Sequence, residues 1–360
     1  MKAAVINRID GTFYVEELEI DEPRGAEVLV EVKAAGLCHS DMIVASVDRG
    51  RPLPMVVGHE MAGIVVGLGP QATDFQIGDH VTASEINFCG CCEECIGGAT
   101  YRCTDPGSIN RTPEDVPKLR RNGEAVNAFG VAGFAEYSLV HQNKLVRVPD
   151  QIPFPQAAVL GCATTTGVGA ALNSAQVQPG DTVAVVGLGG IGLNIVSGAQ
   201  IAGAKTIIGI DLHPAKLELA RKFGATHVIN SGEEDAAARV KEITGRGVQH
   251  SFEAIGLGPT QKLAINLTRV GGGVYFIGIP QGAPLDFNVM MDLLVGQRKL
   301  QGVYMGSSNI RRDIPFYADL YLQGRLNLDD LIGQEISLAQ INDAYGVQES
   351  GAIARSVISF

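Results

Sequence analysis

The stretch "TVAVVGLGGIG" at residues 182–192 decides the fold of this 360-residue chain. An apolar run leads directly into Gly187, Gly189 and Gly192, which form the pattern G-x-G-x-x-G, and apolar residues at helical spacing follow. The first glycine permits a tight turn, the second lets the backbone approach a pyrophosphate, and the third allows close packing of helix on strand. The pattern predicts a strand, a turn and a helix that bind a dinucleotide, provided that its surroundings agree.

The end of the next strand pattern supports this interpretation. "TIIGID" reads as a buried strand that ends in Asp211, 19 residues after Gly192. A carboxylate there accepts hydrogen bonds from the adenosine ribose and repels a 2′-phosphate, so NAD(H) is favoured over NADP(H). An aspartate that caps a helix is the alternative. Lys216, in the following helix pattern, either adds a ribose contact or is a solvated lysine.

Strand and helix patterns alternate through this part of the chain. A helix pattern begins at Pro214 and stops near Gly224. Further apolar runs have the length of buried strands, at residues 227–230, 250–256, 272–279 and 300–305. The alternation predicts a doubly wound parallel sheet, which is a Rossmann domain of the α/β class.

The remaining segments have a different character. Residues 25–88 contain short alternating runs and turn residues, which predict a mostly antiparallel β module. Residues 104–128 lack apolar periodicity and hold three prolines, so we expect a long loop. The tail from about residue 305 ends in the strand-like "ARSVISF", which we expect to return to the β module.

Length and composition limit the classes of function. A chain of this length exceeds the usual size of one core, and 46% hydrophobic residues with 45 glycines are typical of a compact α/β protein. The net charge is −11 and Lys and Arg form no stripe, which argues against nucleic acid or an anionic membrane as a partner. No apolar run reaches membrane-spanning length and the N-terminus lacks signal-peptide features, so we expect a cytoplasmic location.

Five of the seven cysteines are clustered in one short stretch. Cys89, Cys92, Cys95 and Cys103 form the pattern C-x2-C-x2-C-x7-C, which can surround a tetrahedral zinc ion. Four thiolates leave no open position, so such a zinc is structural. An iron–sulfur cluster is the competing interpretation, because clusters also use four cysteines. Cys91 fits no position of the pattern.

A second set of possible metal ligands lies near the front of the chain. "LCHSD" offers Cys38 and Asp41, and "GHE" offers His59 and Glu60. Thiolate, imidazole and carboxylate groups are all common zinc ligands. Spacing alone does not complete this site, and from the residues alone Cys162 reads as a buried small side chain.

The order of these motifs closely resembles the zinc-containing medium-chain alcohol dehydrogenase family over essentially the whole chain. The shared motifs are "CHSD", "GHEMAGIVVGLGPQA", the C-G-x-C-x-x-C lobe, "GCATTTGVGAA", "GLGGIG" and "ID". Segment 104–128 resembles the long form of the dimeric branch, which includes liver-type and glutathione-dependent formaldehyde dehydrogenases. The resemblance implies a homodimer, with a GroES-like catalytic domain at 1–160 that holds a zinc lobe at about 88–104, an NAD-binding domain at 161–302 and a return to the catalytic domain at 303–360.

The resemblance also supplies the missing metal ligand. It implies a catalytic zinc held by Cys38, His59 and Cys162, with a fourth position open to water or substrate, and a second, structural zinc in the four-cysteine lobe. Two thiolates and a neutral imidazole balance the divalent charge, and three protein ligands with an open position are typical of catalytic zinc.

Roles for neighbouring side chains follow from the same resemblance. Asp41 would orient the His59 ring, and Glu60 would lie near the metal and assist ligand exchange. Ser40 would hydrogen-bond the substrate oxygen and begin proton removal. Zinc would lower the pKa of the bound alcohol, and the alkoxide would pass a hydride to the nicotinamide. The implied activity interconverts an alcohol with its aldehyde or ketone, using NAD(H).

Further cofactor contacts implied by the resemblance are less specific. His39 and Arg355 would face the pyrophosphate, and Thr166 and Ile191 would contact the nicotinamide. The backbone at Ile277 and Val303 would hold its carboxamide, and Gly190 belongs to the glycine turn. Ile191 and Ile277 can equally be ordinary core residues.

Three positions depart from the family pattern. Many relatives end a proton relay with a histidine where this chain has Ile43, so the proton must leave by another route, such as the cofactor ribose and water or His39. An aromatic pocket residue is replaced by Glu85 and an apolar one by Arg49. Either these two side chains face solvent or pair with each other, or they line a pocket for a polar substrate.

Two alternatives stand beside a general alcohol dehydrogenase. In the S-(hydroxymethyl)glutathione (formaldehyde) dehydrogenases an arginine holds the glutathione carboxylate; this chain has Gly107 at that position, although Arg111 is nearby. A non-catalytic NAD- or zinc-binding scaffold would be indicated by loss of a catalytic ligand or of Ser40, and neither is lost. Cys162 disfavours sorbitol-type polyol dehydrogenases, and the ligand sets exclude zinc-free quinone reductases.

Overall fold

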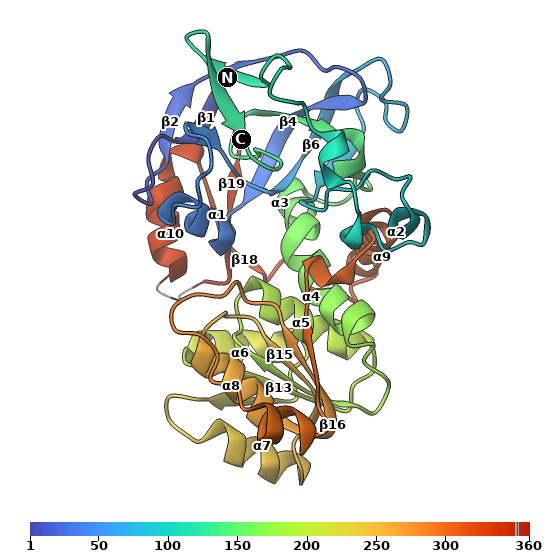
Figure 1. Cartoon of the computed structure of the whole chain (residues 1–360), viewed down its shortest axis with the longest axis vertical. Coiled ribbons are helices and arrows are strands. Elements are labelled where there is room, and N and C mark those ends of the chain that lie inside the picture. Colours follow the sequence, from blue (N-terminus) through green and yellow to red (C-terminus); the bar gives the residue numbers. More distant parts are fainter. Residues whose placement is uncertain (350, 352) are drawn as a thin grey trace. The chain divides into compact units, whose positions relative to one another are not determined.

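The computed structural model describes residues 1–349, 351 and 353–360. The chain forms two compact units, and Figure 1 labels many of their helices and strands. The first unit comprises Met1–Ala163, Asn309–Ser350 and Arg355–Phe360, and the second comprises Thr164–Ser308 and Gly351–Ala354. The functional division expected at residues 160 and 302 stays a prediction.

A six-stranded parallel sheet forms the second unit. Its order is β14-β13-β12-β15-β16-β17, and every neighbouring pair is parallel. The strands are β12 (Thr182–Val186), β13 (Thr206–Asp211), β14 (His227–Asn230), β15 (Val248–Glu253), β16 (Thr268–Phe276) and β17 (Lys299–Gly302). The apolar run before the glycine turn is β12, which lies inside the sheet and is buried except at its first residue.

Helices connect these strands and cover both faces of the sheet. They are α5 (Gly190–Ile201), α6 (Pro214–Lys222), α7 (Ala236–Thr244) and α8 (Gly258–Leu267), while α4 (Thr165–Gly169) precedes β12 and packs against α5. The strand order reverses between β12 and β15, so right-handed crossovers place α5 and α6 on one face and α7 and α8 on the other. α5 contacts α6 and α7 contacts α8, in agreement with this arrangement. The predicted doubly wound sheet is confirmed.

Two sheets form the first unit. One has the order β2-β1-β5-β9-β8-β3, and in the other β11-β7-β6-β4-β19-β18 is joined by β10, which pairs with β4. The first contains β1 (Lys2–Ile6), β2 (Tyr14–Glu17), β3 (Glu19–Ile20), β5 (Met55–Val56), β8 (Leu119–Arg121) and β9 (Glu124–Ala128). The second contains β4 (Glu27–Gly36), β6 (Glu60–Leu68), β7 (His80–Ala83), β10 (Tyr137–His141), β11 (Leu145–Arg147), β18 (Ile332–Ile336) and β19 (Arg355–Ser359). The tail returns as predicted, because β19 pairs with β4.

Among the described residues five α-helices belong to this unit, and short 3₁₀ or π turns occur in both units. The helices are α1 (His39–Ser46), α2 (Glu93–Ile96), α3 (Phe154–Val159), α9 (Ile310–Leu322) and α10 (Ile341–Glu349). The turns are Thr100–Arg102, Pro106–Ile109, Gln142–Lys144, Leu160–Thr164, Ala170–Ser174, Val289–Leu294, Met305–Ser307 and Leu338–Gln340. Across the described residues no helix is long and apolar enough to span a membrane.

The segment expected to be a long loop is partly regular. β8 and β9 form an antiparallel hairpin within residues 104–128. Asn122 and Gly123 connect the two strands with φ values of 53° and 83°, as a two-residue type I′ turn requires. The expectation of an irregular loop is therefore wrong for this stretch, because an Asn-Gly pair specifies a hairpin even where apolar alternation is weak.

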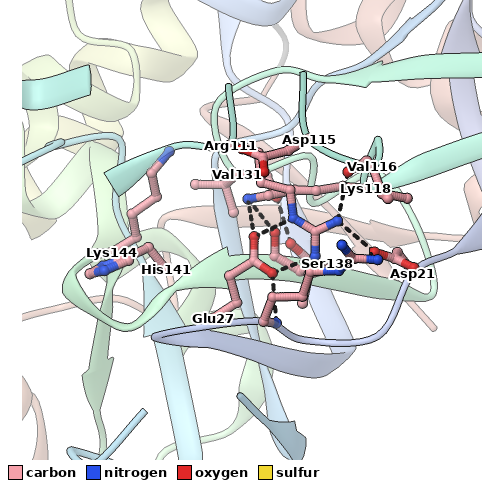
Figure 2. A network of polar contacts seen from close by, with 12 residues as sticks. Asp21, Glu27, Arg111, Asp115, Val116, Lys118, Val131, Ser138, His141 and Lys144 are labelled. Carbon is pink, nitrogen blue, oxygen red and sulfur yellow. Dashed lines mark hydrogen bonds and ion pairs between the residues drawn. The ribbon is translucent and has the colours of Figure 1, made fainter. Parts of the chain in front are cut away.

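Arg111 anchors this segment to β4 through a network of polar contacts, which Figure 2 shows. Its guanidinium donates to both carboxylate oxygens of Glu27 at 2.8 and 2.5 Å and to Asp21 at 2.6 Å. The remaining bonds go to the carbonyls of Val116 at 2.8 Å and Glu22 at 3.0 Å. All five N–H donors of the guanidinium are therefore used.

We expect Arg111→Met to lower the free energy of unfolding by about 3 kcal/mol, because it leaves the buried Glu27 carboxylate without its main partner. Chemical denaturation followed by circular dichroism measures the change. Arg8→Met is the control: the Arg8 side chain is 71% exposed, so loss of its ion pair should have little effect. Equal effects of the two substitutions would show that the Arg111 network does not anchor the segment.

Candidate metal centres and dinucleotide site

The register of β4 and β6 brings Cys38 and His59 together. The two strands are antiparallel, with Gly36 opposite Glu60. Cys38 follows two residues after Gly36 as the N-cap of α1, and His59 directly precedes β6. A Cβ on Gly36 would collide with the Glu60 carboxylate, so glycine is required for this pairing.

Cys162 reaches the same place from a π-helical turn. α3 continues into Leu160–Thr164, and the wider helical turn carries Cys162. Such turns are frequent at functional sites. A Cβ on Gly161 would collide with the carbonyl of Ala83 at the end of β7, so the turn packs directly against β7. In the sheet, β7 is the neighbour of β6, the strand that His59 directly precedes.

These side chains form a compact, buried cluster. One potential ligand atom each of Cys38, His59, Glu60 and Cys162 lies within 4.8 Å of the others. Cys38, His59 and Cys162 are 5%, 7% and 5% exposed, and Glu60 is fully buried. Two sulfur donors and one nitrogen donor at this spacing suit a tetrahedral zinc ion with one further position. The structure thus brings together the three ligands that the resemblance implied.

Asp41 orients the His59 ring. Asp41 Oδ1 lies 3.0 Å from His59 Nδ1 and accepts a hydrogen bond from the Gly58 amide at 3.2 Å. With Nδ1 as the donor, Nε2 keeps its lone pair for a metal ion. Ser40 Oγ lies 3.4 Å from this Nε2 and 3.2 Å from Cys38 Sγ, so the hydroxyl is at the donor cluster itself.

Glu60 and Arg355 form a buried pair beside the donors. Arg355 Nη2 is 3.1 Å from Glu60 Oε1, and Nη1 donates to the Leu37 carbonyl at 2.8 Å. The pairing of β19 with β4 delivers this arginine, because the Ser356 carbonyl accepts from the Leu37 amide at 2.9 Å. The guanidinium therefore balances the Glu60 charge, and its expected contact with a pyrophosphate stays a prediction.

The electrostatics of the cluster fit a bound cation. Burial lowers the pKa of His59, but the charges of Asp41 and of the two cysteine sulfurs outweigh that effect and raise it well above its usual value. A hydrogen bond from Cys162 holds the pKa of Cys38 well below its usual value. Burial raises the pKa of Glu60 to about 7. In the described structure Asp41 Oδ2 and both Glu60 oxygens lack a hydrogen-bond partner, as acceptors near a metal can.

Two side chains of α10 support the corner that carries Cys38, and the sequence alone did not single them out. The Tyr345 hydroxyl donates to the Cys38 carbonyl at 3.2 Å, and the Gln348 amide donates to the Leu37 carbonyl at 3.2 Å. Tyr345 also stacks on Phe13 with 5.4 Å between ring centroids. Tyr345 is 307 positions from Cys38, so no short motif could reveal the contact.

The second cysteine cluster is the lobe predicted for a structural zinc. The Sγ atoms of Cys89, Cys92, Cys95 and Cys103 all lie within 4.8 Å of one another, and two of the pairs are 3.9 Å apart. A single tetrahedral ion with Zn–S bonds of about 2.3 Å separates its sulfurs by roughly 3.8 Å, whereas a multi-iron cluster needs more room. Cys91 is exposed and stands outside the cluster.

The second unit builds the glycine turn predicted for the dinucleotide. Gly187 follows β12 with a φ of 93°, and Gly189 is the N-cap of α5. A Cβ on Gly192 would collide with the Gly187 carbonyl, so the first turn of α5 can lie against the loop only with glycine there. α5 begins at Gly190, and the amides of its first turn are available to an anion, as a pyrophosphate site requires.

Asp211 ties this turn to β13. Its Oδ2 accepts from the Leu188 amide at 2.8 Å, and its Oδ1 accepts from the amides of Leu212 and His213 at 2.8 and 3.1 Å. All three amides precede α6, so Asp211 is not the cap of that helix, and a carboxylate has about four acceptor positions, which leaves room for a ribose contact.

The other predicted cofactor positions are distributed over the second unit. Thr166 and Val303 are buried, whereas Ile191, Ile277 and Lys216 are half-buried. The amides of Ile277 and Val303 donate to neighbouring strands, which fixes the backbone at both positions. Their roles toward the cofactor stay predictions.

The polar residues at the expected substrate positions do not pair with each other. Arg49 is exposed in the loop after α1, and Glu85 is half-buried just beyond β7. Burial raises the pKa of Asp41, and the neighbouring His59 opposes this effect. His39, the first residue of α1, is exposed.

Comparisons with known proteins identify the family. Residues 24–150 match the alcohol dehydrogenase GroES-like domain, and residues 190–320 match the zinc-binding dehydrogenase family. The chain is 36% identical to S-(hydroxymethyl)glutathione dehydrogenase of Synechocystis sp. over 100% of its length and 99% of that protein. It is 35% identical to alcohol dehydrogenase class-3 of Drosophila melanogaster, with 100% and 97% covered. The crystal structure of benzyl alcohol dehydrogenase from Acinetobacter calcoaceticus superposes with a TM-score of 0.93 at 35% identity, with 100% and 99% covered.

Fold, donor sets and relatives together define an NAD(H)-dependent, zinc-containing oxidoreductase. The chain belongs to the zinc-containing medium-chain alcohol dehydrogenase family, in the branch that resembles formaldehyde dehydrogenase.

We expect Cys162→Ala to lower the zinc content from two ions per chain to one, because Glu60 is paired with Arg355, and Cys38 and His59 alone bind zinc weakly. Cys95→Ala should remove the other ion and lower the resistance to denaturant, since structural zinc contributes folding energy. Cys91→Ala is the matched control and should keep both ions. Plasma mass spectrometry of the purified chains measures this, and two ions in Cys162→Ala would remove Cys162 from the ligand set.

Proposed function

We propose that Cys38, His59 and Cys162 hold a catalytic zinc ion and that the chain interconverts an alcohol with its aldehyde or ketone, using NAD(H). The observation that carries this proposal is the buried cluster of two thiols and one imidazole with Ser40 Oγ beside it. When bound, zinc supplies Lewis-acid activation of the alcohol oxygen and NAD⁺ supplies the hydride acceptor.

The residues of this chain position the substrate and the proton. Ser40 Oγ, beside Cys38 and His59, accepts the hydroxyl proton of the alcohol while it donates its own proton toward the cofactor ribose and water. Asp41 keeps the His59 ring in one tautomer, so Nε2 remains a ligand rather than a proton carrier.

In the second unit the glycine turn binds the pyrophosphate, and Asp211 accepts the ribose hydroxyls and disfavours NADP(H).

Oxidation of S-(hydroxymethyl)glutathione is the second candidate, because the Synechocystis relative carries that name. That activity requires a cationic group for the glutathione carboxylates. Arg111 is the nearest arginine to the matching position, and all five of its donors are already used by Asp21, Glu27 and two carbonyls. This observation favours a simple alcohol over the glutathione adduct.

Formation of NADH tests the function directly. Wild-type protein should reduce NAD⁺ with primary alcohols, and Ser40→Ala should lower kcat/KM by about 10²–10⁴-fold through loss of proton transfer. Ser40→Thr, which keeps the hydroxyl, should retain most of the rate. Activity of Ser40→Ala at the wild-type level would contradict the role of Ser40, and a higher kcat/KM for S-(hydroxymethyl)glutathione than for benzyl alcohol would favour the second candidate.

We further propose a homodimer formed through the β17 edge of the second unit. β17 is the last strand of its sheet, and an unpaired strand edge can pair with a second copy about a two-fold axis. The π turn Val289–Leu294 and the residue after it lie just before β17 in the chain. Their exposed apolar side chains are Val289, Met290, Met291, Leu294 and Val295, each 54–61% exposed.

Leu294→Asp should convert the dimer into a monomer, because it places a charge in the apolar contact. Light scattering coupled to size-exclusion chromatography measures the mass. Ile77→Asp, at a residue that is 63% exposed in the first unit, is the control and should stay dimeric. A wild-type monomer, or a dimeric Leu294→Asp variant, would refute this interface.

We propose a cytoplasmic location because of the state and arrangement of the cysteines. All seven cysteines are free thiols, and two clusters of them are arranged as metal ligands rather than as disulfides. Such an arrangement suits a reducing compartment.

A further inference from the structure

Glu85 lies beside the catalytic donors without a partner of its own. It follows β7 by two residues, and the end of β7 touches the turn that carries Cys162 through Gly161. Glu85 is half-buried, and among the residues that the structure describes no hydrogen bond or ion pair engages its carboxylate. The carboxylate is therefore available to a ligand at the site.

Gly130 determines where this carboxylate lies. A Cβ on Gly130 would collide with a Glu85 carboxylate oxygen, so the missing side chain creates the space that the carboxylate occupies. Gly130 has a φ of 67°, which other residues rarely adopt. Its carbonyl accepts a hydrogen bond from Lys144 Nζ at 2.8 Å.

Lys144 adds a buried positive charge to this arrangement. Its side chain is 3% exposed, and its carbonyl accepts from the Ser84 amide, next to Glu85. Figure 2 shows that the Lys144 side chain stands apart from the Arg111–Glu27 contacts. Burial lowers the pKa of Lys144 and the charge of Glu85 opposes this effect, so the two charges interact without forming a direct ion pair. A buried ammonium group with one hydrogen bond is costly, and such groups concentrate at functional sites.

We propose that Glu85, held by Gly130 and balanced by Lys144, selects neutral alcohols that carry a second hydroxyl group. The free carboxylate accepts a hydrogen bond from that hydroxyl. Lys144 offsets the negative charge, so a cationic substrate gains little. Glu85 is thus a specificity-determining residue and Lys144 a positioning residue. This inference rests on the proposed alcohol dehydrogenase function.

Four substrates that differ only at the far end test the proposal: butan-1-ol, butane-1,4-diol, 4-aminobutan-1-ol and 4-hydroxybutanoate. We expect kcat/KM of wild-type protein to be highest for the diol. Glu85→Leu should lower the ratio of diol to butan-1-ol by about tenfold, because a hydrogen bond to a charged group is lost. Glu124→Leu, at an exposed glutamate in the β8–β9 hairpin, is the matched control and should leave the ratio unchanged.

Lys144→Met distinguishes a charge effect from a packing effect. It should raise the ratio of amino alcohol to diol by roughly fivefold or more, because the repulsion of the ammonium group disappears. Lys144→Arg should restore the wild-type ratio. Lys118→Met removes another lysine of the same unit, which is half-buried, and should not change the ratio.

The outcomes separate this inference from the proposed function. If no alcohol is oxidised by wild-type protein, the proposed function fails. If butan-1-ol is oxidised but the substrate ratios do not respond to Glu85→Leu, the inference alone is overturned. A wild-type preference for 4-hydroxybutanoate would also overturn it, because a carboxylate substrate cannot favour a site that presents Glu85.

Discussion

The antiparallel register of β4 against β6 is the constraint on which the catalytic cluster depends. Gly36 stands opposite Glu60, and this pairing alone brings Cys38 and His59 to adjacent positions. A shift of one residue would exchange the two faces of the strand and separate the donors. The absence of a side chain at Gly36 lets the Glu60 carboxylate lie against β4. Backbone pairing therefore places Cys38 and His59, and the π turn Leu160–Thr164 adds Cys162.

Charges buried around this cluster are consistent with a cation at its centre. Glu60 is balanced by Arg355, and Asp41 is engaged by His59. Each of these groups would be costly to bury alone, and together they leave acceptor oxygens without a hydrogen-bond donor in the described structure, as is expected beside a bound cation. The four-cysteine lobe differs, because its donors are all thiols and close around one position. The two clusters thus suit one catalytic and one structural zinc.

Local patterns predicted the parts of the fold that depend on short stretches of chain. The glycine turn, β12 and β13 were recognisable because apolar runs and glycines meet within a few residues. The hairpin at Asn122 and Gly123 was missed, since its strands are short and weakly apolar, although the Asn-Gly pair itself was a usable signal. Cys162 entered only through the family resemblance. Tyr345 and Lys144 could not be found, because they bond the backbone carbonyls of residues outside their own segments, Cys38 and Gly130, and such contacts leave no pattern in the sequence.

The central claim is that Cys38, His59 and Cys162 together bind zinc. Anomalous diffraction from crystals of the protein, recorded on both sides of the zinc absorption edge, tests it most directly. The account predicts two zinc peaks per chain, one of them surrounded by these three side chains and the other by the four cysteines of the lobe. A single peak, confined to the lobe of a fully active protein, would contradict it.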